Sequence, residues 1–160
     1  MSLKEGDRVN LRVIQGGRSG RPRRLDERRI AIVVDDEELS RELLGSVLKR
    51  INSPLVEIHE FADPGSALSF AHGREVDLAL IDLHLGAGQM NGLELVDRIR
   101  AETPAGDRFS AILITADTEP MIVYEAMLHH VAVVMEKAVN LYRLALHCCA
   151  LLRIPPPREE

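Results

Sequence analysis

The chain has 160 residues, the size of one domain, and 46% of them are hydrophobic, which is enough for a sizeable core. Only 3% are aromatic and none is tryptophan, so this core must be aliphatic. No apolar stretch reaches the ~20 residues of a membrane span, and the N-terminus lacks the apolar segment of a secretory signal. We therefore expect a cytoplasmic protein without a membrane partner.

Charge is unevenly distributed along the chain. Residues 1–29 carry nine Lys and Arg against four Asp and Glu, whereas residues 30–160 carry eleven against twenty-one. The sequence thus predicts an acidic domain preceded by a basic arm at residues 1–28. The Gly- and Arg-rich stretch 16–24 cannot bury enough apolar surface to offset its ordering entropy, so we expect a flexible arm. Alternating apolar residues within 9–13 favour a short strand or docking segment there.

From residue 29 onward, two hydrophobic periods alternate. Short β-branched runs predict five strands, and apolar residues spaced three and four apart predict five helices. The strands are expected at residues 30–34, 55–61, 76–82, 109–115 and 131–136. The helices are expected at residues 37–50, 64–72, 91–100, 120–129 and 140–153, with Asp117 or Thr118 capping the fourth. The first helix carries Leu39, Leu43, Leu44, Val47, Leu48 and Ile51 at helical spacing.

Strands that alternate with helices predict a parallel sheet with helices on both faces, because each crossover is right-handed and must bury its apolar stripe. The expected fold class is α/β, with a doubly wound five-stranded parallel sheet. Ligands of such sheets bind beyond the carboxyl ends of the strands, so the residues at those ends are the candidates for a functional site.

Polar residues stand at the ends of four predicted strands. Asp35 and Asp36 follow the first strand, Asp82 ends the third, Thr115 ends the fourth and Lys137 follows the fifth. Three carboxylates in one pocket repel one another and take up protons unless a cation neutralises them. Oxygen ligands without His or Cys suit Mg²⁺. A divalent ion with a carboxylate, a Lys and a Thr is the arrangement needed to accept a phosphoryl group.

Five segments resemble the receiver domain of two-component response regulators, of the stand-alone CheY-like type. They are 31-AIVVDDEELSRELL-44, 76-VDLALIDLHL-85, 91-NGLELVDRIR-100, 111-AILITA-116 and 131-VAVVMEK-137. The resemblance covers residues 29–153 and implies a flavodoxin-like sheet with strand order 2-1-3-4-5. The tail at residues 154–160 is too short for an output domain, so signalling through protein contacts is expected.

The resemblance also implies a role for each strand-end residue. Asp82 would accept the phosphoryl group from a phosphohistidine on a sensor histidine kinase or phosphotransfer protein. The acyl phosphate would then hydrolyse slowly, so the chain would be a phosphoprotein and not an enzyme. The resemblance also implies that Asp35, Asp36, Asp82 and the backbone carbonyl of His84 would bind Mg²⁺. Thr115 would form a hydrogen bond with the phosphoryl group, and Lys137 would form an ion pair with it.

The family's output surface comprises the fourth helix, fifth strand and fifth helix, and would contact an unknown downstream protein or a second copy of the chain. The fourth helix of this chain carries more apolar residues than one buried stripe needs, which is a hint of such a surface. Core packing is expected to account for most of them. They are Met121, Val123, Tyr124, Met127 and Leu128.

The chain departs from the family's pattern in three places. Ala138 follows Lys137, where receivers usually have a proline after a cis peptide bond. Because a cis bond before a non-proline residue costs about 2.5–4 kcal/mol, a trans bond or a locally rebuilt loop is expected. Val134 occupies the position of the usual switch aromatic. The loop at 83–92 is longer than the common form and contains three glycines, so we expect it to be mobile.

Two other classes of function are weighed. A Mg²⁺-dependent hydrolase with an aspartyl phosphate would show sustained turnover, but such enzymes carry Asp-x-Asp after the first strand, which Asp35 and Asp36 do not match. A binding module could use the basic arm, which could also fold back on the acidic domain. The arm lacks interleaved aromatics and its charge gives only weak, salt-sensitive attraction, which argues against nucleic acid as a partner.

Cys148 and Cys149 are expected to be small apolar residues on a helix, one facing inward.

Overall fold

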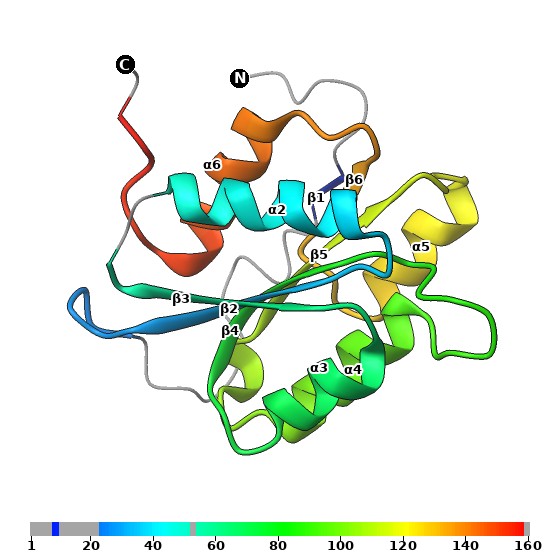
Figure 1. Cartoon of the computed structure of the whole chain (residues 1–160), viewed down its shortest axis with the longest axis horizontal. Coiled ribbons are helices and arrows are strands. Elements are labelled where there is room, and N and C mark those ends of the chain that lie inside the picture. The colour runs from blue at the N-terminus through cyan, green and yellow to red at the C-terminus, as the bar shows by residue number, and fades with distance from the viewer. Residues whose placement is uncertain (1–7, 10–22, 52–53, 159–160) are drawn as a thin grey trace.

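The computed structural model describes residues 8–9, 23–51 and 54–158. They form one six-stranded sheet with helices on both faces (Figure 1). The strands are β1 (Arg8–Val9), β2 (Arg29–Val34), β3 (Val56–Phe61), β4 (Val76–Ile81), β5 (Ser110–Thr115) and β6 (Val133–Glu136). The helices are α2 (Glu38–Arg50), α3 (Pro64–Ala71), α4 (Gly92–Glu102), α5 (Pro120–Leu128) and α6 (Leu141–Leu152), with a 3₁₀ turn at Gly106–Arg108.

The order across the sheet is β1-β6-β5-β4-β2-β3, and the five strands from β2 to β6 are parallel. Numbered among themselves, these five strands have the order 2-1-3-4-5. The predicted fold class and strand order are therefore confirmed. Element ends differ from the prediction by one or two residues, and α5 is capped at Glu119, directly before Pro120, and not at Asp117 or Thr118.

β1 adds a strand that the five-stranded prediction lacks. It pairs antiparallel with β6, with Arg8 opposite Val134 and Val9 opposite Val133. The alternation within 9–13 predicts a short strand or docking segment, and Val9 lies in one. The expectation of a flexible arm covers residues 1–28, of which 1–7 and 10–22 lie outside the described residues.

The core consists of two aliphatic layers, one on each face of the sheet. Helices α2 and α6 cover one face, and α3, α4 and α5 cover the other (Figure 1). Every residue of β4 is buried, because this central strand has helices on both sides. None of the helices in the described part of the chain is long and apolar enough to span a membrane.

The apolar residues of α2 divide between the core and the surface. Leu44, Val47 and Leu48 are buried, but Leu39 is 75% exposed and Leu43 is 46% exposed. A helix on a sheet buries one stripe of its surface, and six apolar residues spread over more than that stripe. Their common helical spacing therefore did not make them all core residues.

Helix α5 also presents apolar side chains to solvent. The expectation that core packing accounts for most of its apolar residues is wrong, since only Val123 of the five packs against the core and is partly buried. The helix has a single fully buried residue, Ala126, so it touches the domain over a narrow face. The exposed side chains are Met121, Tyr124, Met127 and Leu128.

A buried ionic cluster lies at the amino-terminal ends of the strands. The Asp77 side chain, near the start of β4, is 4% exposed and accepts hydrogen bonds from Nε and Nη2 of Arg23, each at 3.0 Å. It also accepts from Nε of Arg108 at 3.1 Å and from the backbone N–H of Ile30 at 2.9 Å. Arg23, a residue of the basic segment, is thus fixed to the centre of the sheet.

Arg29 is buried at the start of β2 and is bound by backbone carbonyls. Its Nε donates to the carbonyl of Leu152 at 2.6 Å, and Nη1 donates to that of Glu27 at 2.5 Å. Nη2 lies 3.4 Å from the carbonyls of Arg24 and Arg153. A cation is favourable at the carboxyl-terminal end of α6 because the helix dipole is negative there.

The sequence predicts one cysteine facing inward on a helix, and the structure buries both on α6. Helix α6 packs against both the sheet and α2, and Ile154 of the tail folds back onto the same apolar layer. The helix therefore buries a wider stripe than contact with the sheet alone would require. Burial raises the pKa of the Cys148 and Cys149 thiols, which disfavours the reactive thiolate.

We expect neither thiol to react readily with Ellman's reagent in the native protein at neutral pH. Unfolding in denaturant should expose both cysteines and release two equivalents of product. The measurement is the absorbance time course with and without denaturant. Rapid release of one equivalent from the native protein would show that one thiol faces solvent.

Candidate functional site

The carboxyl ends of four parallel strands meet at one rim of the sheet. Asp35 follows β2, Asp82 follows β4, Thr115 ends β5 and Lys137 follows β6. Asp82 is next to Asp35 because Ile81 is in register with Val34, and the backbone N–H of Asp82 donates to the Val34 carbonyl at 3.0 Å. Strand register therefore brings together residues that are distant in sequence, such as Asp35 and Lys137, which are 102 positions apart.

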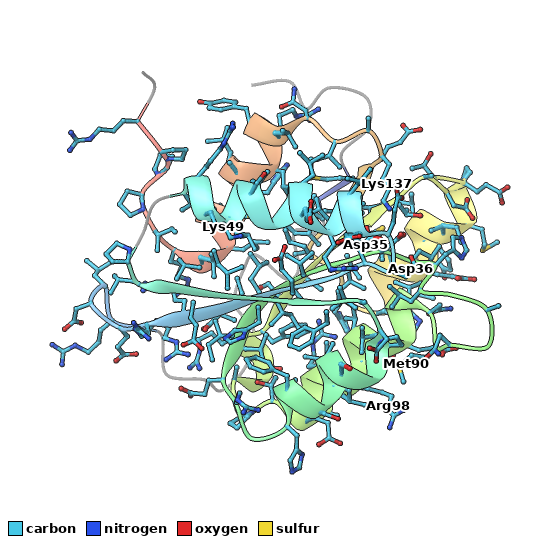
Figure 2. All side chains as sticks on the ribbon, viewed as in Figure 1. Asp35, Asp36, Lys49, Met90, Arg98 and Lys137 are labelled. Atoms are coloured by element: carbon cyan, nitrogen blue, oxygen red, sulfur yellow. The ribbon has the colours of Figure 1, made fainter. Side chains whose placement is uncertain are left out.

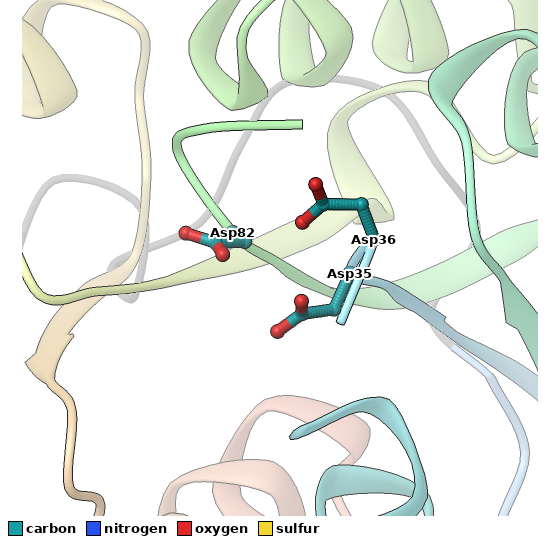
Figure 3. Close-up of side chains that lie close together, drawn as sticks. All are labelled: Asp35, Asp36 and Asp82. Carbon is teal, nitrogen blue, oxygen red and sulfur yellow. The ribbon is translucent and has the colours of Figure 1, made fainter. Parts of the chain in front are cut away.

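Three carboxylates form a cluster at this rim. One oxygen each of Asp35, Asp36 and Asp82 lies within 4.8 Å of the others, and the side chains extend the same way (Figure 3). Asp35 is completely buried, Asp82 is 8% exposed and Asp36 is exposed. The cluster thus has a buried floor and one side open to solvent.

The ammonium of Lys137 bridges two of these carboxylates. Its Nζ lies 2.8 Å from Oδ2 of Asp82 and 3.1 Å from Oδ2 of Asp35, and Figure 2 shows it beside the pair at 35 and 36. Burial lowers the pKa of Lys137, but the hydrogen bonds and attraction to both carboxylates raise it above its ordinary value. The side chain is therefore charged at neutral pH and offsets part of the negative charge.

Further donors hold Asp35 in place. Its Oδ1 accepts from the backbone N–H of Glu37 at 2.9 Å, and its Oδ2 accepts from the hydroxyl of Ser40 at 2.6 Å. Nη1 of Arg41 donates to the Asp35 carbonyl at 2.8 Å. Glu37 caps α2, so the same turn that starts the helix also orients the carboxylate. The sequence singled out neither Ser40 nor Arg41, because an amphipathic pattern does not report hydrogen bonds.

Thr115 and His84 lie on the β5 side of the rim. The Thr115 side chain is completely buried, and its Oγ1 accepts from the backbone N–H of Asp117 at 3.1 Å. The imidazole of His84 is 70% exposed and lies 3.6 Å from Oδ2 of Asp117. His84 borders an open hollow of about 650 Å³ that is also lined by Ala116, Asp117, Thr118 and Glu119.

The peptide bond between Lys137 and Ala138 is cis, so the expectation of a trans bond is wrong. The preference for trans is a property of the isolated dipeptide, whereas tertiary contacts hold Lys137, on one side of this bond, in the folded domain. Its backbone N–H donates to the Thr115 carbonyl at 3.0 Å, and its ammonium binds the two carboxylates.

The loop that follows Asp82 is attached to the domain at several points. Leu83 and Leu85 are buried, and the N–H of Gly92 donates to the Leu83 carbonyl at 2.7 Å. A Cβ atom on Gly92 would lie 2.3 Å from the carbonyl oxygen of Asp82. Only glycine permits this approach. The sequence did not reveal it, because Gly92 is one of three glycines in the loop and nothing in the pattern distinguishes it from the other two.

The donor set at the rim fits a hard divalent cation. It consists of carboxylate oxygens, the ligand type that Mg²⁺ prefers, and the exposed Asp36 leaves room for the water ligands that Mg²⁺ retains. Three carboxylates against one ammonium also leave net negative charge at the rim, which such an ion would balance.

Comparison with known proteins identifies the family. The model for the response regulator receiver domain matches residues 31–148. The chain belongs to this family. The carboxylate cluster and Lys137 lie within the matched residues.

Two curated proteins are related to this receiver domain in sequence. The cyclic di-GMP phosphodiesterase response regulator RpfG of Xanthomonas campestris pv. campestris is 31% identical over 129 residues, which are 81% of this chain and 33% of that protein. A cyclic di-GMP phosphodiesterase of Thermotoga maritima is 30% identical over 76% of this chain and 30% of its own length. The chain thus spans about a third of each relative.

Solved receiver domains have the same fold. The signal receiver domain of an HD domain-containing protein from Pseudomonas fluorescens Pf-5 has a TM-score of 0.69 and 25% identity, over 83% of this chain and 93% of that one. The chemotaxis protein CheY4 of Vibrio cholerae has a TM-score of 0.65 and 21% identity, over 80% and 99% respectively. The latter likeness concerns the fold alone.

Proposed function

We propose that this receiver domain accepts a phosphoryl group on Asp82 from a phosphohistidine of a sensor histidine kinase or phosphotransfer protein. The observation that carries the proposal is the convergence of Asp82 with Asp35, Asp36 and Lys137 at one partly open rim. A carboxylate nucleophile next to an ammonium and a divalent-ion site has the charges that phosphoryl transfer requires.

In the proposed reaction, a carboxylate oxygen of Asp82 forms a bond to phosphorus as the phosphorus–nitrogen bond of the donor histidine breaks. The imidazole nitrogen keeps the bonding electron pair. Mg²⁺ bound by Asp35, Asp36, Asp82 and the His84 carbonyl would neutralise the oxygens of the transferring group. Lys137 balances the remaining charge from the side of β6.

Thr115 would bind the phosphoryl group after the transfer. Its Oγ1 accepts the N–H of Asp117 at 3.1 Å, so the proton of the hydroxyl itself is available for donation to a phosphoryl oxygen. Such a bond would draw Thr115, and with it the β5–α5 loop, toward Asp82. Because Val134 replaces the usual aromatic, the change would reach the surface through the backbone of this loop.

The exposed apolar side chains of α5 support protein contact as the output. Monomeric proteins expose few contiguous apolar patches, and four large apolar residues are exposed within the nine residues of this helix. We propose that α5, β6 and α6 form the surface for a downstream protein or a second copy of the chain. The phosphodiesterase activity in the names of the relatives is not part of this proposal, since the chain aligns with about a third of each.

Intact mass spectrometry after incubation with acetyl phosphate and Mg²⁺ tests the proposal. The native chain should gain one phosphate and Asp82→Asn should gain none, because an amide is not a nucleophile here. Asp26→Asn, which alters an exposed carboxylate far from the rim, should be modified like the native chain.

Equal modification of the native chain and Asp82→Asn would remove Asp82 from the assigned role. Phosphate release from acetyl phosphate distinguishes the hydrolase alternative. A receiver should release less than one equivalent of phosphate over the time of the labelling, because the transfer releases acetate and the phosphoryl group stays on Asp82, whereas a hydrolase would release phosphate continuously.

A further inference from the structure

Ser40 lies in the first turn of α2, directly behind the carboxylate cluster. Its hydroxyl donates to Oδ2 of Asp35 at 2.6 Å. The same oxygen accepts from Nζ of Lys137 at 3.1 Å, and Oδ1 accepts from the N–H of Glu37 at 2.9 Å. Three donors from three different residues therefore fix the plane of a carboxylate that is completely buried.

Ser40 and Lys137 donate to the same oxygen of Asp35. The Ser40 hydroxyl lies 2.6 Å from Oδ2, and the Lys137 ammonium lies 3.1 Å from Oδ2 and 2.8 Å from Asp82. Without the hydroxyl, Oδ2 of Asp35 would lose one of the two side-chain donors that the described residues give it, and the other is shared with Asp82. The orientation of the buried carboxylate would then be less firmly fixed.

We propose that Ser40 is a positioning residue for divalent-ion binding at the rim. It orients the buried Asp35 carboxylate, so that an oxygen of Asp35 stays directed at the cluster. The inference rests on the proposed function of the rim. Groups that orient a metal ligand typically contribute about 10- to 100-fold in metal affinity.

Titration of the metal-free protein with Mn²⁺, followed by the electron paramagnetic resonance of the free ion, tests this role directly. We expect Ser40→Ala to bind Mn²⁺ about 10- to 100-fold more weakly than the native chain. Ser40→Thr keeps the hydroxyl and should restore most of the affinity. Ser46→Ala is the matched control, since Ser46 lies on the same helix and its hydroxyl donates to the Leu43 carbonyl, away from the rim.

Native affinity in Ser40→Ala, or equally weak binding by Ser40→Ala and Ser40→Thr, would overturn the inference. Denaturant unfolding of each metal-free variant shows whether a loss of affinity reflects a loss of fold. The phosphorylation test on the native chain distinguishes the two proposals. If the native chain binds Mn²⁺ and is phosphorylated on Asp82 while Ser40→Ala binds equally well, only the role of Ser40 fails.

Discussion

Asp77→Asn should destabilise the folded domain by about 3 kcal/mol, although residue 77 lies at the opposite end of the sheet from the proposed phosphorylation site. The substitution preserves the shape of the side chain and removes its charge. Asp77 accepts from Arg23 and Arg108, whose side chains are only 13% and 19% exposed. Breaking a buried pair costs more than forming it contributes, because the remaining charge stays desolvated.

The expected cost lies at the lower end of the range for buried pairs because Glu75 remains. It is 3.2 Å from Nη1 of Arg23 and 2.9 Å from Nη2 of Arg108, so neither guanidinium loses all of its charge compensation. Hydrogen bonding to Arg108 lowers the pKa of Glu75, although burial opposes this shift. Glu75 is therefore ionised at neutral pH and is in place to serve as the second partner.

Urea unfolding of the native chain, Asp77→Asn and Asp26→Asn measures this effect. Asp26 pairs with Arg24 at 3.4 Å, but both side chains are more than 70% exposed, so its substitution should change the free energy of unfolding by no more than about 1 kcal/mol. Equal stability of the two variants would mean that the cluster at Asp77 is as well solvated as a surface pair.

Gly92→Ala should both destabilise the domain and impair phosphoryl acceptance. The added methyl group would lie 2.3 Å from the carbonyl oxygen of Asp82 and 3.0 Å from its carbonyl carbon. Both atoms belong to the backbone of the proposed phosphoacceptor and cannot move without displacing its carboxylate. Overpacking of this kind costs about 1–3 kcal/mol and sometimes more, because the backbone must shift.

Gly65→Ala is the matched control for this substitution, since Gly65 also lies in the first turn of a helix. The nearest atom to its added methyl group would be Oδ1 of Asp63 at 3.4 Å, an ordinary contact with a side chain. We expect unchanged or slightly higher stability, because alanine is the better helix former. Urea unfolding and acetyl phosphate labelling of both variants check the prediction. Native stability and labelling in Gly92→Ala would contradict the observed proximity of Gly92 to Asp82.

The spacing of the apolar residues along the sequence was enough to predict the parallel α/β sheet. The segment 76–82 is apolar except for Asp77 and Asp82 and predicts a buried strand, and every residue of β4 is buried. The polar residues of the rim could be found in the same way, because Asp35, Asp82 and Thr115 each follow directly on an apolar run and Lys137 follows one after Glu136. Parallel strands place all their carboxyl ends on one edge, so Asp35, Asp82, Thr115 and Lys137 could be assigned to that edge without coordinates.

Side-chain burial and partner choice were determined only by how the elements pack. Leu39 and Leu48 are nine residues apart and therefore lie on opposite faces of α2, and the sheet packs against the face of Leu48, so the first is exposed and the second is buried. Asp77 lies within the apolar run of β4, and its partners Arg23 and Arg108 are 54 and 31 residues away. Periodicity reports neighbours along one element and carries no information about such long-range contacts. For the same physical reason, the hydrogen bond between Ser40 and Asp35, the tight approach at Gly92 and the cis bond after Lys137 were found only in the tertiary structure.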